Sequence, residues 1–397
     1  MLKVLCIIGT RPEAIKMAPV IRELGKHPAQ IQTVVCSTGQ HRQMLDAALS
    51  LFGIRPDVEL SVMQANQSLA GLTARLLEAI DRVLLDVQPD WVLAQGDTTT
   101  VLAAAMAAFY RHIRFGHVEA GLRTNNTQHP FPEEINRRMA DGMTDLLFAP
   151  TVTSRSNLLR EHYAAEKIIV TGNTVIDALE MVAAMAYDWD GGPLAGLPAD
   201  QRLVLVTAHR RESTCGEGGP FREICLAIRD LAEHYADNGT HFVYPVHLNP
   251  AVRRHVQEIL VPARNISLLE PLDYLSLVQL MKRCSLVITD SGGIQEEAPG
   301  LGIPVLVMRE TTERPEGLSE GVVKLVGTSR QRIRTESMTV LDSPAAHQAM
   351  ARSVNPYGDG KASARIVSAL LKPPRARRPS AGTAVSGGKR RVVRRPS

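Results

Sequence analysis

The segment at residues 286–304, LVITDSGGIQEEAPGLGIP, decides the fold. Apolar and β-branched residues come first, an Asp-Ser-Gly-Gly turn follows, and a pair of glutamates begins a helical stretch that ends at Gly-Ile-Pro. This order is typical of one strand–turn–helix unit of a parallel sheet, in which ligands bind beyond the carboxyl ends of the strands. Glycines let the backbone approach a ligand, and a helix start presents free N–H groups to phosphate oxygens. The segment therefore predicts an anion site at Ser291, Gly292 and Gly293, with a plain strand–helix connection as the alternative.

The same alternation of short apolar runs and helical periods extends along the whole chain. A Gly-, Pro- and Asp-rich stretch around Trp189 interrupts it and is typical of a linker. We therefore predict an α/β protein with two doubly wound, Rossmann-like domains facing each other across a cleft. The expected parts are an N-terminal domain at 1–188, a linker at 189–202, a C-terminal domain at 203–371 whose last helix packs back on the first, and a disordered basic tail at 372–397.

Composition excludes several classes of protein. No run of 18 apolar residues occurs among the 397, and the N-terminus has too short an apolar stretch for a signal peptide. The five cysteines show no metal-ligand spacing, which favours reduced thiols in a cytoplasmic protein without a metal. The tail carries nine of the 45 basic residues and no acid, so the body has 36 basic against 41 acidic residues. We expect a solvated tail, with contact to anionic lipid or nucleic acid as the alternative, and predict no nucleic-acid or membrane partner for the protein.

Three acids follow expected strands or begin a helix in the first half of the chain. Asp97 lies in QGDTTT, Glu119 in HVEAGLR, and Glu133 in HPFPEEINRR. Helix capping and helix-dipole pairing are the alternatives for these residues. Because the loops meet at one sheet edge, we expect the acids to raise one another's pKa and to exchange protons near neutral pH.

Basic residues occupy the corresponding loops and favour an anionic ligand. Arg11 and Lys16 begin a helix after the first strand, although the loop is neither GxGxxG nor a P-loop, and two solvated cations are an equal alternative. His209 follows a strand beside two arginines, and Arg314 follows the strand after the glycine turn. Glu297 can accept hydrogen bonds from two neighbouring hydroxyl groups, as on a ribose. The pattern predicts a site for a nucleotide diphosphate.

With these residues the sequence resembles the bacterial, non-hydrolysing UDP-N-acetylglucosamine 2-epimerases. The resemblance covers residues 9–360 through ten ordered motifs: GTRPEAIKMAP, QGDTTT, GHVEAGLRT, PFPEEINR, VTGNTVIDAL, TAHRRES, YPVHLNP, TDSGGIQEEAPGLG, PVLVMRETTERPEG and NPYGDG. It implies a glycosyltransferase-B type fold, a homodimer, no cofactor, and interconversion of UDP-GlcNAc and UDP-ManNAc in the supply of surface polysaccharide. The implied mechanism eliminates UDP to give a 2-acetamidoglucal and then adds UDP back.

The resemblance also implies roles for individual residues. Catalysis falls to the three acids and His209, and the UDP contacts fall to Arg11, Lys16, Ser291, Gly292, Gly293, Glu297 and Arg314. Family members often bind a second, activating UDP-GlcNAc, for which Gln40, His41 and Gln43 are the matching residues. Asn66 stands where activated relatives carry an arginine, which argues against activation here.

Three other functions remain compatible with the motifs. A hydrolysing relative would release UDP and free ManNAc. A glycosyltransferase of the same fold would pass the sugar to an acceptor. A catalytically silent sensor of nucleotide sugars would be expected to lack one of the three acids, and none is missing.

Overall fold

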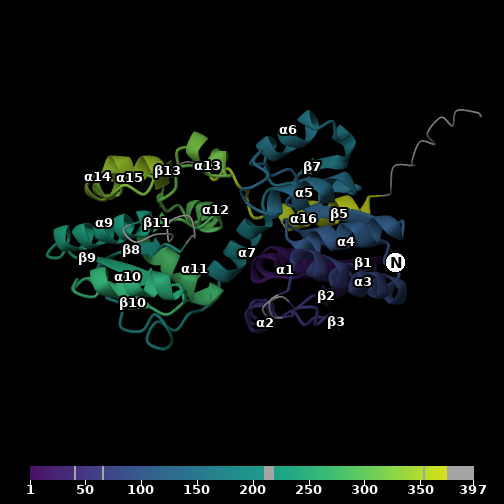
Figure 1. Cartoon of the computed structure of the whole chain (residues 1–397), viewed down its shortest axis with the longest axis horizontal. Coiled ribbons are helices and arrows are strands. Elements are labelled where there is room, and N and C mark those ends of the chain that lie inside the picture. The colour runs from purple at the N-terminus through teal and green to yellow at the C-terminus, as the bar shows by residue number, and fades with distance from the viewer. Residues whose placement is uncertain (40–41, 65–66, 210–218, 352–353, 373–397) are drawn as a thin grey trace, which may run out of the picture.

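Two parallel β-sheets form the frame of the protein (Figure 1). The computed structural model describes residues 1–39, 42–64, 67–209, 219–351 and 354–372. The first sheet has the order β3-β2-β1-β4-β5-β6-β7. Its strands are β1 (Leu2–Ile8), β2 (Ile31–Ser37), β3 (Val58–Glu59), β4 (Trp91–Gln95), β5 (Arg114–Val118), β6 (Leu146–Ala149) and β7 (Ile168–Val170).

The second sheet has the order β10-β9-β8-β11-β12-β13. Its strands are β8 (Arg202–Thr207), β9 (Thr240–Pro245), β10 (Ile266–Leu269), β11 (Cys284–Thr289), β12 (Val305–Val307) and β13 (Val323–Leu325). In each sheet the strand order reverses between two central strands, β1 and β4 in the first and β8 and β11 in the second. A ligand in a doubly wound sheet binds at this reversal. The prediction of two doubly wound α/β domains is confirmed.

Helices alternate with the strands. In the first domain they are α1 (Arg11–Gly25), α2 (Arg42–Leu51), α3 (Leu69–Val87), α4 (Thr99–Tyr110), α5 (Glu133–Gly142), α6 (Val152–Arg160), the 3-10 turn η1 (Ala165–Lys167) and α7 (Thr174–Ala183). Those that follow are α9 (Pro220–His234), α10 (Pro250–Leu260), α11 (Tyr274–Arg283), α12 (Ile294–Gly300), α13 (Pro315–Ser319), α14 (Arg330–Asp342), α15 (Pro344–Ala351) and α16 (Ala362–Leu371).

Helix α3 shows how the sequence sets these elements. Its apolar residues recur at spacings of three and four, and Leu72, Leu76, Ile80 and Val83 are buried against the sheet. The side chain of Ser68 caps the first turn by accepting a hydrogen bond of 3.1 Å from the amide of Gly71. The helix packs beside α4, so its buried face forms the core under that side of the first sheet.

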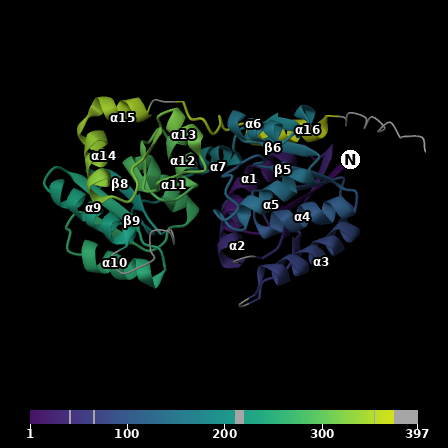
Figure 2. The same cartoon turned by 45° about the horizontal axis from the view of Figure 1, so that its top comes forward.

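The two domains are joined twice. Helix α7 lies between them and packs on α1 of the first domain and on α11 and α12 of the second (Figure 1). The chain then returns, and α16 packs against α1 and α7 (Figure 2). Asp177 of α7 accepts the amides of Ala362 at 3.2 Å and Ser363 at 2.8 Å, which caps α16. These contacts make α7 the main structural link between the domains.

The tail after Lys372 lies outside the described residues. Within the part that the structure covers, no helix combines the length and the apolar character needed to cross a membrane.

Candidate active site

The loop after β1 forms one side of the site, and Glu13 organises it. Its carboxylate accepts the amides of Gly9 at 2.5 Å and Thr10 at 3.0 Å, and the hydroxyl of Thr98 at 2.5 Å. Burial raises the pKa of Glu13 to about 7, and the nearby charge of Asp97 adds to this shift. The first loop and the loop after β4 are therefore joined through one buried carboxyl group.

Glu119 follows β5 and lies at the centre of a polar cluster. Lys16 of α1 and Gln95 at the end of β4 contact its carboxylate, and Asn173 donates a hydrogen bond of 2.9 Å to it. Its backbone is held at a φ of +71°, in the left-handed region that side chains rarely adopt. Tertiary contacts, not local preference, therefore fix where this carboxylate lies.

The electrostatic balance at Glu119 differs from the expectation. Burial alone would raise the pKa of Glu119, but the ammonium group of Lys16 more than offsets this and lowers it. The prediction of a raised pKa, based on mutual repulsion of acids, is wrong for this residue. The reason is that its nearest charged neighbour is a cation, so the carboxylate is ionised at neutral pH and is equipped to accept a proton.

Asp97 lies in the neighbouring loop, directly after Gly96. Its carboxylate pairs with Arg137 of α5, and its backbone carbonyl accepts a hydrogen bond of 3.0 Å from Asn136 of the same helix. Gly96 adopts a φ of +89°, and a Cβ atom there would lie 3.8 Å from the carboxylate of Glu119. The structure therefore places the Asp97 loop beside Glu119.

Helix α5 begins with two glutamates that have different environments. Glu134 is fully buried and accepts the amides of Thr124 at 3.0 Å and Asn125 at 3.1 Å, so it is a structural group. Glu133 is partly exposed and has no hydrogen bond or ion pair within the described part of the chain. Of the two acids, Glu133 is the one left available for a ligand.

The second domain contributes the turn that follows β11. The amide of Ser291 donates a hydrogen bond of 2.9 Å to the hydroxyl of Thr289, which orders the turn. A Cβ atom on Gly292 would lie 2.8 Å from Nη1 of Arg314, so a larger residue would displace the guanidinium group. Gly293 has more room, because a Cβ atom there would first meet Glu297 at 3.9 Å. The glycines bring the backbone next to a buried cation.

An ion network connects the two domains at this turn. Nε of Arg314 lies 2.7 Å from Oε1 of Glu296, and the other oxygen of Glu296 lies 3.3 Å from Nζ of Lys16. Lys16 thus contacts Glu119 of the first domain and Glu296 of the second. A diphosphate carries the same charge sign as these carboxylates, so both cations are suited to bind it. Glu296 was not singled out in the sequence, although it lies in the first quoted segment.

Glu297 lies one residue further along α12 and faces a different group. It accepts a hydrogen bond of 2.9 Å from the hydroxyl of Tyr274, and burial raises its pKa while the charge of Arg11 opposes the shift. Arg11 belongs to the first domain, so its charge acts on Glu297 across the domain boundary. A buried carboxyl group of this kind can accept hydrogen bonds from sugar hydroxyls.

His209 follows β8, on the other side of the strand reversal from the glycine turn. Its amide donates a hydrogen bond of 2.7 Å to Asp290, and its Nδ1 lies 3.3 Å from the same carboxylate. The ring stacks on His247 with centroids 5.1 Å apart, and burial together with the nearby His209 lowers the pKa of His247. This arrangement orients the His209 ring and leaves its Nε2 side, in a half-exposed position, for a ligand.

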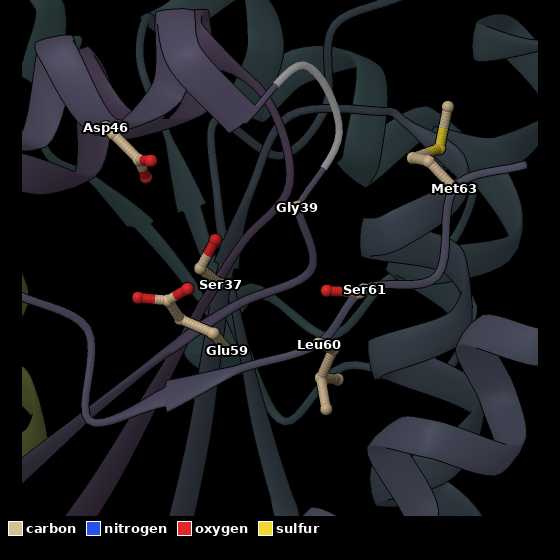
Figure 3. A pocket seen from close by; sticks show the side chains of 7 residues that line it. All are labelled: Ser37, Gly39, Asp46, Glu59, Leu60, Ser61 and Met63. Atoms are coloured by element: carbon tan, nitrogen blue, oxygen red, sulfur yellow. The ribbon is translucent and has the colours of Figure 1, made fainter.

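The residues predicted to bind an activator are only partly described. Gln40, His41 and Asn66 lie outside the described residues, and the structure places Gln43 in α2 without describing its side chain. A separate pocket of about 110 Å³ lies nearby, at the ends of β2 and β3 (Figure 3). It is lined by Ser37, Gly39, Asp46, Glu59, Leu60, Ser61 and Met63. None of the residues predicted to contact UDP lines this pocket.

Several residues with evident roles were not singled out in the sequence. Gln95 and Asn173 hold Glu119, Arg137 holds Asp97, and Glu13 joins two loops. Each lies within one of the quoted motifs, and this position in a motif was the signal in the sequence that could have identified it. The polar partner of each residue comes from a distant part of the chain, so the motif alone did not reveal the contact.

Comparison with known proteins shows what this arrangement is similar to. A family model described as UDP-N-acetylglucosamine 2-epimerase matches residues 22–371. The UDP-N-acetylglucosamine 2-epimerase of Escherichia coli K12 is 51% identical over 375 residues, covering 93% of this chain and 98% of the relative.

Two solved structures are similar in fold as well. The UDP-GlcNAc 2-epimerase of Neisseria meningitidis bound to UDP-GlcNAc has 47% identity and a TM-score of 0.85, over 94% of this chain and all of the other. The enzyme of Methanocaldococcus jannaschii, in complex with UDP-GlcNAc and UDP, has 33% identity and a TM-score of 0.78, over 93% and 99%.

Proposed function

Since the chain belongs to the bacterial, non-hydrolysing UDP-N-acetylglucosamine 2-epimerase family and is therefore an isomerase, we propose that it interconverts UDP-GlcNAc and UDP-ManNAc by eliminating UDP and adding it back. One observation supports this proposal most directly. Lys16 lies between Glu119, an ionised acid suited to proton transfer, and Glu296, which also binds Arg314. The groups for proton transfer and for diphosphate binding thus belong to one network.

The chemical steps balance without an added reactant. A carboxylate takes the C2 proton, the electrons of the C–H bond form the C1=C2 double bond of 2-acetamidoglucal, and the C1–O electron pair leaves with UDP. In the return step a proton reaches C2 from the opposite face, and the UDP oxygen bonds to C1. Asp97, Glu119 and Glu133 carry the protons in this scheme. The scheme uses no redox cofactor and no metal.

The second half of the scheme depends on retention of UDP. Lys16 and Arg314 neutralise the diphosphate, Ser291, Gly292 and Gly293 approach it through the backbone, and Glu297 accepts the ribose hydroxyls. The charge of Arg11, from the first domain, opposes the rise that burial causes in the pKa of Glu297, so Arg11 is suited to contact UDP from that side. Because the cations come from both domains, bound UDP holds the domains together while the glucal waits for re-addition.

Deuterated water tests the proposal. The protein is incubated with UDP-GlcNAc in D₂O, and C2 of the sugar is followed by NMR. We expect deuterium at C2 in both UDP-sugars and little free UDP. A hydrolysing enzyme would instead accumulate UDP and free ManNAc, whereas a glycosyltransferase or a sensor would leave C2 unlabelled. Accumulation of UDP with free ManNAc, or a C2 without deuterium, would refute the proposal.

His209→Ala is expected to slow C1–O bond cleavage, by about 100-fold or more. The imidazole is oriented by Asp290 toward the site and can stabilise or protonate the departing phosphate oxygen. Substrate labelled with ¹⁸O in the bridging position reports cleavage directly, because the label scrambles into non-bridging positions when UDP detaches and returns. His241→Ala, on β9 and hydrogen-bonded to Ser267, is the control. Unchanged scrambling in His209→Ala would leave the residue with a structural role only.

We also propose that the enzyme is a cytoplasmic homodimer whose product supplies ManNAc units for surface polysaccharide. Large apolar side chains are exposed on the outer helices of the first domain, and these are Leu85 of α3, Phe109 and Tyr110 of α4, and Ile135 and Met139 of α5. The three helices pack side by side (Figure 2). Their exposed apolar side chains therefore belong to one surface, and a contiguous apolar surface of this kind marks a protein interface. The described cysteines are buried free thiols, which fits a reducing compartment.

A further inference from the structure

A fully buried histidine lies directly behind the Asp97 loop. His117 belongs to β5, and its Nε2 lies 2.7 Å from the carbonyl oxygen of Gly96, the residue before Asp97. Its Nδ1 lies 2.6 Å from Oδ1 of Asp141 near the end of α5. One ring therefore connects the turn after β4 with the helix that carries Glu133.

The identity of the two partners fixes the protonation of this ring. A backbone carbonyl and a carboxylate are both acceptors, so each ring nitrogen must carry a hydrogen, and a ring with both hydrogens is an imidazolium. Arg123 donates to the other oxygen of Asp141 at 2.7 Å and to Glu161 at 2.7 Å. The cluster thus holds two cations and two anions, and its net charge is zero. This balance makes a buried charge tolerable.

Helix α5 presents one face to this part of the sheet. Asp141 contacts His117, and Arg137, one turn earlier, contacts the carboxylate of Asp97. Asn136 binds the backbone carbonyl of Asp97 at 3.0 Å. The spacing of four residues places Arg137 and Asp141 on the same side of the helix. The two ends of the Gly96–Asp97 unit are thus attached to α5, one directly and one through His117.

We propose that His117, held as a buried imidazolium, is a positioning residue that fixes the Gly96–Asp97 turn against α5 for proton transfer. The inference rests on the proposed function, because it assumes that Asp97 acts at C2. If the ring lost its proton, either the Gly96 carbonyl or Asp141 would lose its donor inside the protein. The turn, in which Gly96 adopts a φ of +89°, would then lose its attachment to α5 through His117 and keep those through Arg137 and Asn136. A shift of about 1 Å at a catalytic group can cost about 100-fold in rate.

The charges around the ring predict how the effect depends on pH. Burial alone would lower the pKa of His117, but Asp141 and the Gly96 carbonyl outweigh burial and raise it. A raised pKa means that the imidazolium contribution is complete at low pH and is lost as the pH rises through the pKa of the folded protein. The charged groups that act on the ring are Asp141, which raises its pKa, and Arg123, which lowers it. Glu161, Tyr163 and Arg138 lie one contact further out, around Arg123 and Asp141. Positioning by His117 should therefore fail on the alkaline side.

NMR of protein with ¹⁵N-labelled histidine tests the charge without reference to activity. We expect both ring nitrogens of His117 to carry a proton at pH 8, where an ordinary histidine is neutral. The signal is assigned by its absence in His117→Gln or, if that variant does not fold, by its perturbation in Asp141→Asn. A neutral ring in one tautomer would overturn the inference even if the enzyme epimerises its substrate. If the wild-type protein did not epimerise, the proposed function would fail on its own, whatever the ring's charge.

Kinetics test the positioning role. In Asp141→Asn the amide can donate to Nδ1, so the ring becomes neutral while both hydrogen bonds remain in place. We expect kcat at pH 7 to fall by no more than about tenfold and the alkaline fall in kcat to be lost or shifted. His117→Gln cannot make both bonds, so its kcat should fall by about 100-fold with KM within about twofold. His241→Gln, far from this cluster, is the control. An unchanged alkaline limb in Asp141→Asn, or an unchanged kcat in His117→Gln, would contradict the proposal.

Discussion

Glu119→Gln is expected to lower turnover by about 100- to 10,000-fold, the usual contribution of one positioned acid or base. Glutamine has the same shape and can still meet Asn173 and Gln95, but it cannot take a proton from C2. Its effect should therefore fall on kcat. Binding of UDP should persist, because Arg314 and the glycine turn belong to the second domain. The variant thus separates the chemical step from nucleotide binding.

The measurements for this variant are steady-state turnover, calorimetric binding of UDP, and deuterium entry at C2. Glu258→Gln is the matched control, because it makes the same chemical change at an exposed position of α10. Turnover of Glu119→Gln close to that of the wild type would remove Glu119 from the mechanism and leave it as the partner of Lys16. A loss of turnover together with a loss of UDP binding would instead show that the cluster around Lys16 had collapsed.

The lowered pKa of Glu119 also has a consequence for stability. A carboxyl group whose pKa is lowered in the folded state contributes stability at pH values above its unfolded pKa, which is ordinarily 4.5 for this side chain. That contribution is lost as the pH falls through the folded value. The Lys16–Glu119 pair is therefore fully formed at neutral pH, and its loss belongs to acid denaturation, outside the range in which the enzyme would be assayed.

The fold could be predicted from sequence because its signals are local and repeated. The apolar periodicity of α3 and the strand before the glycine turn are complete within short segments. The edge strands β3 and β13 carry little signal of their own, because each has a charged residue within a run of two or three, and their pairing with β2 and β12 supplies the order. Glu133 and Glu134 show the corresponding limit at the site. Both begin one helix, and only tertiary contacts distinguish the buried structural acid from the available one.

Charge states were harder to predict than positions. The sequence placed Asp97 and Glu119 in adjacent loops, as the structure does, but gave no indication that Arg137 and Lys16 would neutralise them. Likewise, Glu297 was identified in the helix after the glycine turn, whereas the ion network across the domains runs through its neighbour Glu296. Consecutive residues of a helix point in directions about 100° apart, so a single position changes which domain a side chain meets.

Asp97→Asn is expected to lower kcat by about 100- to 10,000-fold while the protein stays folded. Asparagine keeps the shape and can still accept a hydrogen bond from Arg137, but it cannot carry a proton to or from C2. Arg137 also retains Glu134, which lies 3.2 Å from Nη1, so the substitution does not leave a buried cation without an anion. A large fall in activity should therefore come without a matching fall in melting temperature.

The control for Asp97→Asn is Asp230→Asn, which removes the carboxylate from another Asp–Arg pair. Asp230 and Arg330 form hydrogen bonds of 2.6 and 2.8 Å between α9 and α14 of the second domain. An effect that came only from breaking such a pair would appear in both variants, whereas an effect on catalysis should appear in Asp97→Asn alone. Equal activities of the two variants would assign Asp97 to loop structure.

The direction of the assay adds a second test of the same residue. Epimerisation removes the C2 proton from one face in UDP-GlcNAc and from the other in UDP-ManNAc, so an acid that serves a single face should be more important for one exchange than for the other. Deuterium entry into each UDP-sugar, started from each substrate, measures the two exchanges separately in Asp97→Asn and in Glu119→Gln. If the two variants lose opposite exchanges, each carboxylate serves its own face of the sugar. If both variants lose both exchanges equally, the two carboxylates act as one coupled unit, as their adjacent loops would allow.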